Sequence, residues 1–385
     1  MKEKLFLLDA YALIFRSYYA FIKNPRINTK GFNTSAIFGF TNTLIEILNK
    51  ENPSHIAVVF DPPGGSFRNE IYTEYKANRD ETPEAIKQSV PFIKDILRAL
   101  NIKIVEITGF EADDTIGTIA KKLASEKFEV FMMTPDKDFT QLVDENIKIY
   151  KPGRRGGEAE VIDVVKVKET FGVQDPDQVR DVLALWGDSS DNVPGAPGIG
   201  EKTSKKLIGE YGTVENLFEN ADKLTGRQKE SIKNNVEQIK LAKLLVTIRQ
   251  DVPVDVTCDD LKIVEPQHDE LKKIFADLEF RTLADRFFSN TSNQISGTQL
   301  DLFGNPIQSQ PEKKTDTKQL ENQEVEIKIN EKYRLADTLF LRKQVLAELL
   351  NSKEASFDCE TTGLSPQEDS IIGVSFSTKS GEAWY

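Results

Sequence analysis

The sequence predicts an α/β fold with a doubly wound, mostly parallel sheet, followed by a helical subdomain. Up to residue 150, short and almost continuously apolar runs alternate with amphipathic helical patterns. Continuous apolar runs are typical of parallel strands that are buried on both faces, and the helices between them serve as crossovers. The length of 385 residues leaves room for about two or three domains.

The elements of this first part follow from its apolar pattern. Strands are predicted at residues 4–10, 55–61, 101–107, 128–134 and 146–150. Thr82 is expected to cap a helix that has Pro83 in its first position, because proline is favoured there. Apolar residues then recur at helical spacing up to Leu100, and residues 111–126 repeat the pattern.

Composition divides the rest of the chain. Helical patterns joined by Gly and Pro turns continue to about residue 285, whereas 289–330 is polar and charged and reads as a disordered linker. A helix and three strands are expected after it, at residues 340–350, 355–360, 371–378 and 382–385. We therefore predict an α/β domain, a helical subdomain, a linker and a partial second α/β domain at residues 1–165, 166–287, 288–330 and 331–385.

Bulk composition narrows the chemistry. A net charge of −12 argues against a nucleic-acid partner unless many of the acids bind metal ions. Two cysteines and two histidines cannot supply a disulfide framework or a Cys-type zinc site, and they supply a His-rich zinc site or a Ser-His-Asp triad poorly. We see neither a signal peptide nor an apolar run of about 18 residues. A cytoplasmic location without a membrane is expected.

Nine carboxylates are expected to meet at one edge of the sheet, because ligands bind outside the carboxyl ends of parallel strands. They are Asp9, Asp61, Glu111, Asp113, Asp114, Asp136 and Asp138 after the strands, and Asp188 and Asp191 from the helical region. One such acid alone is usually a turn or cap residue, but a crowded set repels itself unless cations are bound. Oxygen-only ligands indicate Mg²⁺ or Mn²⁺, and two such ions suit phosphodiester hydrolysis.

The segment "GAPGIGEKT" imitates a nucleotide-binding loop. Gly195 and Gly200 have the required separation, but Glu201 intervenes before Lys202 and no strand precedes the loop. A helix-hairpin motif at residues 187–212 that grips DNA phosphates is the better interpretation, and an ordinary tight turn is the alternative. The candidate DNA-binding residues of the hairpin are Gly198, Gly200, Lys202, Thr203, Lys205 and Lys206.

A basic and aromatic segment, "SFRNEIYTEYKANRDETP", lies between Asp61 and the helix after Pro83. Bases can stack on its aromatic rings while Arg68, Lys76 and Arg79 contact phosphates. A solvated helix face is the alternative interpretation.

These segments, in this order, resemble the flap endonuclease family, which has a PIN-like fold, and within it the 5′-nuclease domain of bacterial DNA polymerase I. The resemblance covers residues 1–287. It is carried by "LLDAYALIFRSYYA", "VVFD", "FRNEIYTEYKANR", "FEADDTIGTIA", "TPDKDFTQLV" and "GDSSDNVPGAPGIGEKT". It implies 5′→3′ exonuclease and structure-specific flap cleavage of branched or nicked DNA, and removal of RNA primers in DNA replication and repair.

The resemblance also implies roles for single residues. Asp9, Asp61, Glu111, Asp113 and Asp114 would serve mainly one metal ion, and Asp136, Asp138, Asp188 and Asp191 mainly the other. Lys76 and Arg79 would orient the scissile phosphate. Arg68 is grouped with them as catalytic, and Arg16 and Tyr75 are further candidate DNA contacts. Carbonyls around residues 198–203 would bind K⁺. The chain departs from the family at Pro135, where glycine is usual, and at Trp186, where a smaller apolar residue is usual.

From about residue 331 the chain resembles the start of an RNase H-like 3′→5′ exonuclease domain. "FDCETTGL" matches its first motif, with Asp358 and Glu360 as metal ligands. Later motifs and a polymerase domain are not found before Tyr385. We therefore expect a fragment of a longer polymerase that neither proofreads nor polymerises.

The linker contains "QLDLF", which resembles the short peptide that binds the replication sliding clamp. It comprises Gln299, Leu300, Asp301, Leu302 and Phe303. Two apolar anchors in a disordered segment suit a peptide–groove contact, but a chance match stays open.

Two other functions compete with the nuclease hypothesis. A PIN-like RNA nuclease shares acids at the end of a parallel sheet, but the hairpin and the basic segment speak against it. A non-catalytic DNA-binding or clamp-tethered module gains little from the acids. A monomer is assumed.

Overall fold

The computed structural model describes residues 2–125, 127–153, 158–292, 332–336, 339–352, 354–361, 371–379 and 382–385. The chain divides into two compact units, Met1–Pro306 and Ile307–Tyr385. The predicted linker falls mostly outside the described residues, and the predicted clamp peptide falls there entirely. The domain boundaries given above stay predictions.

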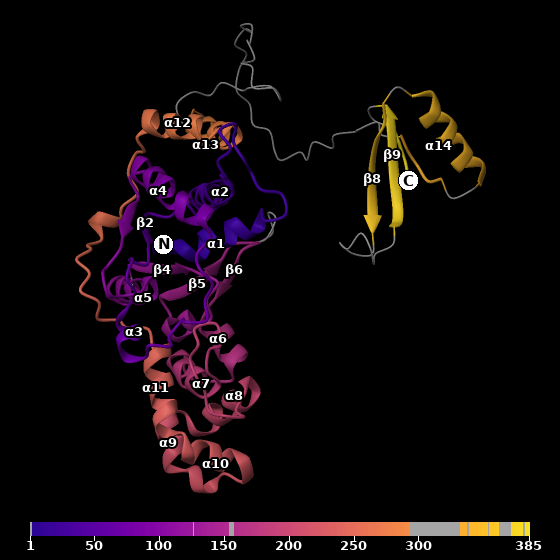
Figure 1. Ribbon diagram of the computed structural model, residues 1–385. Coiled ribbons are helices and arrows are strands. Elements are labelled where there is room, and N and C mark those ends of the chain that lie inside the picture. The colour runs from indigo at the N-terminus through magenta and orange to yellow at the C-terminus, as the bar shows by residue number, and fades with distance from the viewer. Residues whose placement is uncertain are drawn as a thin grey trace, which may run out of the picture. The chain divides into compact units, whose positions relative to one another are not determined.

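The first unit is built on a six-stranded sheet with the order β3-β2-β1-β4-β5-β6 (Figure 1). Its strands are β1 (Glu3–Asp9), β2 (His55–Val59), β3 (Lys103–Val105), β4 (Phe128–Met133), β5 (Ile147–Lys151) and β6 (Glu160–Ile162). Strands β1 to β5 are parallel, and β6 runs antiparallel to β5. The predicted doubly wound, mostly parallel sheet is confirmed; β6 is an addition that the sequence analysis missed.

Helices cover both faces of this sheet, because alternate residues of its strands enter two separate cores. Phe6 and Leu8 pack with α1 (Ala10–Ala20), α2 (Ser35–Glu51), α4 (Glu84–Ala99) and α12 (His268–Asp277). Leu5 and Leu7 pack with α5 (Ala112–Leu123) and with residues of the helical region. Two short helices, α3 (Phe67–Ile71) and the 3-10 helix η1 (Asp138–Leu142), and the later α13 (Arg281–Ser292) complete this part.

The start of α4 differs from its prediction by one residue. Pro83 occupies the N-cap position, the helix begins at Glu84, and no side chain caps it. Thr82 is therefore outside the helix rather than its cap. Proline fits at this boundary because its missing N–H would have no partner in the first turn of a helix.

The predicted helical subdomain is confirmed as a group of helices beyond one end of the sheet (Figure 1). Its members are α6 (Val164–Phe171), α7 (Val179–Trp186), α8 (Glu201–Tyr211), α9 (Val214–Glu219), α10 (Gly226–Asn234) and α11 (Val236–Val246). The 3-10 helices η2 (Pro176–Gln178), η3 (Ala221–Lys223) and η4 (Asp259–Leu261) lie at its turns and after it. The glycine-rich segment forms the connection between α7 and α8.

The second unit contains a four-stranded sheet of order β7-β10-β9-β8 and one helix. Its elements are β7 (Lys332–Arg334), α14 (Leu339–Asn351), β8 (Ser356–Thr361), β9 (Ile371–Lys379) and β10 (Glu382–Trp384). The predicted helix and three strands are present, and β7 is an addition. Among the described residues of the whole chain, no helix has the length and apolar character needed to span a bilayer.

Candidate active site

The first two acids lie where β1 and β2 end. Asp9 closes β1 and caps α1, because the backbone N–H of Ala12 donates to its Oδ1 at 3.0 Å. Thr134, which follows β4, donates to the other oxygen at 3.1 Å. Asp61 accepts a hydrogen bond of 2.8 Å from the backbone N–H of Ala112 at the start of α5. Parallel strands therefore deliver both acids to one edge, as the sequence predicts.

The start of α5 contributes three more acids, and they do not share one role. Glu111 is the N-cap, and its Oε1 accepts from the Ser66 hydroxyl at 2.9 Å. Asp113 takes part in the electrostatics of the cluster, since Asp136 and Asp9 are among the groups that raise its pKa. Asp114 is fully buried and accepts two hydrogen bonds from Arg68, at 2.6 and 2.8 Å.

The remaining acids stand on two loops. Asp136 and Asp138 follow β4, and the Asp138 N–H donates to Asp136 Oδ1 at 2.9 Å. Asp188 and Asp191 lie on a turn that the backbones of Asp188 and Val193 close with bonds of 2.9 and 2.7 Å. Glycine is required where this turn meets α7, since a Cβ on Gly187 would lie 2.5 Å from a backbone nitrogen.

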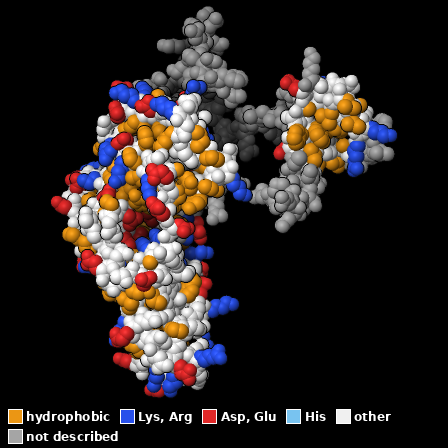
Figure 2. All heavy atoms as spheres, in the orientation of Figure 1, with side chains coloured by type: hydrophobic (Ala, Val, Ile, Leu, Met, Phe, Trp, Pro, Cys, Tyr) orange, Lys and Arg blue, Asp and Glu red, His pale blue; other side chains and the backbone are white. Residues whose placement is uncertain are grey.

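The loops and strand ends converge. A single pocket is lined by acids from three of these segments, namely Glu111, Asp113, Asp138, Asp188 and Asp191. Asp9, Asp61 and Asp136 act on one another and on this group electrostatically. Figure 2 shows acidic side chains in the hollow between the sheet and helices α6 to α11. The expected edge cluster is therefore present; whether each acid binds a metal ion stays a prediction.

The electrostatics of the cluster suit cations. Burial, together with the neighbouring Asp61 and Asp136, raises the pKa of Asp9 to about 7 against the hydrogen bonds that it accepts. Burial and neighbouring acids also hold the pKa values of Asp113 and Asp138 well above their usual range. Oδ1 of Asp138 is buried without a hydrogen-bond partner. Buried, crowded carboxylates with an unsatisfied oxygen fit divalent cations that prefer oxygen ligands.

The acid side chains are not oriented to coordinate a metal ion in this structure. Within the described residues, no three Asp, Glu, His or Cys side chains are arranged to hold one ion directly. Several of them are instead turned toward the protein's own cations. Side-chain rotation would therefore have to accompany metal binding.

Lys76 and Arg79 provide two of these cations. Nζ of Lys76 lies 2.9 Å from Glu111 and 3.6 Å from Asp191, and Arg79 is paired with Asp191. Burial tends to raise the pKa of Glu111, but Lys76 and Arg68 outweigh it and hold that pKa below its usual value. Lys76 and Arg79, which were predicted to orient the phosphate, therefore lie in contact with the acids.

Lys137 is a functional candidate that the sequence analysis missed. Its Nζ lies 2.6 Å from Asp188 Oδ2 and 5.3 Å from the ring centre of Trp186, which packs against the core. Burial raises the pKa of Asp188, but hydrogen bonds from Lys137 and Ser190 outweigh this and lower it. Its position between Asp136 and Asp138 is the one signal in the sequence that points to it.

Two predicted substrate contacts, Arg68 and Tyr75, are buried in this structure, and one predicted metal ligand, Asp114, is bonded to Arg68. Arg68 is 2% exposed and donates to the Leu245 carbonyl, Glu111 and Asp114, so its guanidinium is not open to a phosphate in this structure. Tyr75 is 4% exposed, and its hydroxyl contacts Glu111 and Asp191 at 3.1 Å each, so its ring is not open to a base in this structure. The substrate roles of Arg68 and Tyr75 stay predictions. Both oxygens of Asp114 are taken by Arg68, which leaves it a supporting role. Burial was not visible in the sequence because a basic segment reads as exposed.

Four of the six hairpin candidates, Gly198, Gly200, Lys202 and Lys206, are exposed. Gly198 has a φ of 75°, Gly200 caps α8, and no atom lies within 4 Å of a Cβ built on either. The remaining hairpin candidates are half-buried: Lys205 is bonded to Glu201 at 2.6 Å, and Thr203 lies in the first turn of α8.

The structure gives the positions of three further predicted site residues, Arg16, Asp358 and Glu360. Arg16 is exposed on α1 and donates to the carbonyls of Pro152 and Gly153 at 3.1 and 3.3 Å. Asp358 and Glu360 lie on β8, and the Asp358 side chain is exposed. Their predicted roles are not tested by these positions.

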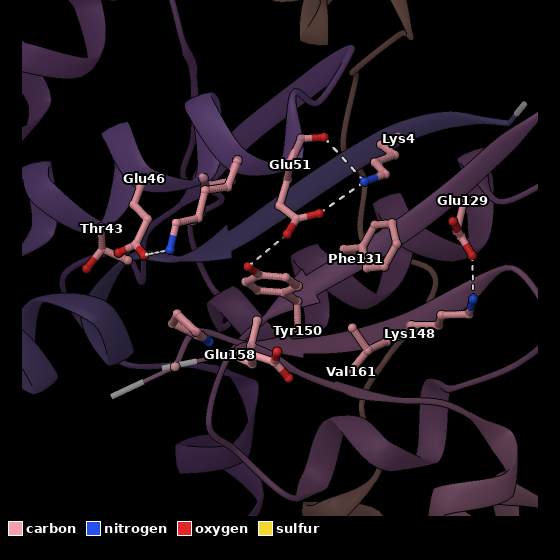
Figure 3. Close-up of a pocket in the computed structure, with 15 residues that line it drawn as sticks. Lys4, Thr43, Glu46, Glu51, Glu129, Phe131, Lys148, Tyr150, Glu158 and Val161 are labelled. Carbon is pink, nitrogen blue, oxygen red and sulfur yellow. Dashed lines mark hydrogen bonds and ion pairs between the residues drawn. The ribbon is translucent and has the colours of Figure 1, made fainter. Parts of the chain in front are cut away.

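A second hollow carries none of the predicted site residues (Figure 3). Charged side chains line it in pairs: Lys4 lies 3.0 Å from Glu51, and Lys148 is bonded to Glu129. The hydroxyl of Tyr150 donates to Glu51 at 3.1 Å. Because these charges are already compensated, the acid cluster remains the candidate active site.

Comparison with known proteins gives the family. Residues 4–172 match the N-terminal resolvase-like domain of 5′-3′ exonucleases, and residues 174–269 match their C-terminal SAM fold. A 5′-3′ exonuclease of Aquifex aeolicus is 37% identical over 295 residues, which cover 76% of this chain and 99% of that protein. The chain belongs to the 5′-3′ exonuclease family. The predicted resemblance is confirmed, and with it the enzyme class of nuclease.

Longer relatives share the same region. DNA polymerase I of Bacillus caldotenax is 36% identical over 296 residues, which cover 76% of this chain. The chain spans about a third (33%) of the length of that relative. The fold of this family member is also that of the bacteriophage T5 flap endonuclease solved as a pseudo-enzyme-product complex with DNA and metal ions. The TM-score is 0.52 and the identity 24%, over 74% of this chain and 100% of that one.

Proposed function

We propose that the chain is a Mg²⁺-dependent 5′→3′ exonuclease and structure-specific flap endonuclease. It hydrolyses phosphodiesters of DNA and of RNA primers on DNA, as the N-terminal part of a DNA polymerase I in replication and repair. The observation that carries the proposal is the set of buried acids at one sheet edge, with raised pKa values at Asp9, Asp113 and Asp138 and an oxygen of Asp138 that has no hydrogen-bond partner. Crowded, buried carboxylates repel one another unless divalent cations neutralise them. Membership of the 5′-3′ exonuclease family makes the supported reaction a nuclease reaction.

The proposed metal ligands fall into two sets. Asp9, Asp61, Glu111 and Asp113 would serve mainly one ion, and Asp136, Asp138, Asp188 and Asp191 mainly the other. Bound Mg²⁺ or Mn²⁺ would supply an activated water and would neutralise charge on the scissile phosphate. Asp114 is left out of this set because Arg68 occupies both of its oxygens.

Lys76 and Arg79 are proposed to orient the scissile phosphate. Both already lie at the acid cluster, so a phosphate held there would be within the range of flexible side chains. The backbone N–H of Lys76 donates to the carbonyl of Asp191 at 2.9 Å, and its φ of 58° is in the left-handed region. A non-glycine residue held in this conformation supports a functional position for Lys76.

The hairpin is proposed to hold the duplex away from the cleavage point. Gly198 and Gly200 leave the backbone open to a phosphate, and α8 presents its N-terminal N–H groups beside the exposed Lys202. Loop carbonyls in residues 198–203 are proposed to bind K⁺. A solved relative of the same fold, the T5 flap endonuclease, is a complex with DNA, which supports a DNA substrate here. Clamp binding through Gln299 to Phe303 stays a separate proposal.

The test is cleavage of 5′-end-labelled flap DNA with Mg²⁺ and with EDTA, beside a single-stranded RNA control. The proposal predicts Mg²⁺-dependent cut products from the flap and little from the RNA. Cleavage of the RNA alone would favour a PIN-like RNA nuclease. Binding of the flap without cleavage would favour a non-catalytic module.

A further inference from the structure

The segment 245–249, at the end of α11, forms one wall of the acid pocket. Leu245, Val246 and Ile248 line it together with Glu111 and Asp138. The same three residues are 2%, 4% and 3% exposed, so their backbone groups have no access to bulk water. Buried backbone groups need protein partners, and the identity of those partners shows what the segment is attached to.

Arg68 binds one side of this segment. Its Nε donates to the carbonyl of Leu245 at 2.7 Å, and its Nη2 donates to the carbonyl of Thr247 at 3.0 Å. The rest of the guanidinium is bonded to Asp114, and Nη1 lies 3.4 Å from Glu111. Arg68 therefore joins the helical region to the acids at the start of α5.

Gln141 binds the other side. Its Nε2 donates to the carbonyl of Val246 at 2.9 Å, and its Oε1 accepts from the N–H of Ile248 at 3.1 Å. The same Nε2 donates to the carbonyl of Asp138 at 2.8 Å. Gln141 is 5% exposed and uses both ends of its amide. It therefore joins the same segment to the acid loop after β4.

We propose that Arg68 and Gln141 are positioning residues that hold the two acid sets in register against segment 245–249. Each contacts alternate residues of that segment, and each reaches a different acid set. A shift of about 1 Å in a reacting group can lower a rate by about 100-fold. Neither residue touches the substrate; each acts through the acids. The inference rests on the proposed function for its kinetic part only.

A merely structural role is the alternative, and the chain offers a matched control for it. Gln178 bridges backbone groups in the same way: it donates to the carbonyl of Gly212 at 3.1 Å and accepts from Gln174 and Asp175 at 2.8 and 3.0 Å. None of these partners belongs to the acid cluster. Gln178→Met and Gln141→Met therefore remove equal numbers of hydrogen bonds at different places.

The experiment compares the two variants with the unmodified full chain in thermal unfolding, calorimetric titration with Mn²⁺ and flap-cleavage kinetics. We expect Gln141→Met to lower kcat by about tenfold or more, with KM for flap DNA changed by less than about twofold. Its Mn²⁺ affinity without DNA should fall several-fold. Gln178→Met should show neither effect.

The inference is overturned if Gln141→Met and Gln178→Met agree within about twofold in both kcat and Mn²⁺ affinity. If Gln141→Met does not fold, Gln141→Asn keeps the amide but shortens its reach, and the same criteria apply. Arg68→Lys keeps the charge but not the planar guanidinium. Like Gln141→Met, it should lower kcat and Mn²⁺ affinity with little change in KM for flap DNA. An unmodified chain that cleaves no flap would sink the proposed function, while the Mn²⁺ titration would still decide the positioning role.

Discussion

Arg68 and Asp114 face one another as a buried ion pair with two hydrogen bonds, of 2.6 and 2.8 Å. The two residues are 2% and 0% exposed and come from α3 and α5, which are far apart in sequence. Two parallel N–H···O contacts are the strongest geometry that a guanidinium and a carboxylate can form. The pair fixes α5, and thereby Glu111, against the end of α11.

Removal of one partner of this pair should be costly. Arg68→Met leaves the Asp114 carboxylate buried without its counter-ion, and breaking a buried pair in this way typically costs about 3–5 kcal/mol. We expect that loss in urea unfolding at neutral pH. The double variant Arg68→Met with Asp114→Leu should regain part of it, because no charge stays buried. A loss below about 1 kcal/mol for the single variant would contradict the pairing.

Removal of one acid from the cluster should instead raise the free energy of unfolding when no metal ion is bound. Asp138 has a buried oxygen without a hydrogen-bond partner and is repelled by Asp136, Asp188 and Asp191, so Asp138→Asn should stabilise the metal-free protein by on the order of 1 kcal/mol at pH 8. Urea unfolding in EDTA measures this. Asp95→Asn, at an exposed acid on α4, is the control and should change stability by less than about 0.5 kcal/mol. Destabilisation by Asp138→Asn in EDTA would show that the cluster is not strained by its charge.

A buried histidine at the opposite edge of the sheet should make the stability of the protein depend on pH. His55 begins β2, its Nδ1 lies 2.8 Å from the Ser54 hydroxyl and 3.6 Å from Glu3, and its Nε2 is buried without a partner. Burial lowers the pKa of His55, with Lys262 and Lys127 adding to that effect and Glu3 opposing it.

A lowered histidine pKa means that the unfolded chain binds more protons than the folded one. The contribution of His55 is therefore complete above its unfolded pKa of about 6.5 and is lost as pH falls through the folded value. Urea unfolding between pH 5 and 8 should show this loss, and His55→Gln should flatten the curve. An identical pH profile in that variant would rule out His55 as the source.

The hairpin charges should appear in the salt dependence of DNA binding. Lys202→Ala should weaken binding of flap DNA and lower the slope of log K against log salt by about 1, because one phosphate contact is lost. Lys166→Ala, at an exposed lysine on α6, is the control and should leave the slope unchanged. An unaltered slope in Lys202→Ala would count against the role of the hairpin.

Sequence reasoning found the features that are local or that follow from the parallel sheet. Strands such as β1 and β2 are continuous apolar runs, and Asp9 and Asp61 had to share an edge because parallel strands end together. The short strands β6 and β7 were not predicted because their residues, Glu-Val-Ile and Lys-Tyr-Arg, do not form a longer apolar run. Their existence depends on pairing with β5 and β10.

The buried position of Arg68 could not be predicted, for a different reason. Arg68 was expected to meet phosphates because the residues around it are basic and aromatic. Its burial depends on carbonyls at Leu245 and Thr247, which lie more than 170 positions away along the chain. Lys137 and Gln141 likewise acquire their roles from Asp188 and from segment 245–249. Contacts at such separations leave no periodic signal in the sequence.

The most direct test of the account is the Asp136→Ala variant in cleavage and binding of a labelled 5′ flap. Asp136 interacts electrostatically with Asp9 and Asp113 of one proposed ligand set and with Asp188 and Asp191 of the other. Its loss should therefore affect both proposed metal sites. We predict that cleavage in Mg²⁺ is abolished while the flap still binds with measurable affinity. Turnover equal to that of the unmodified chain would contradict the assignment of the acid cluster as the active site.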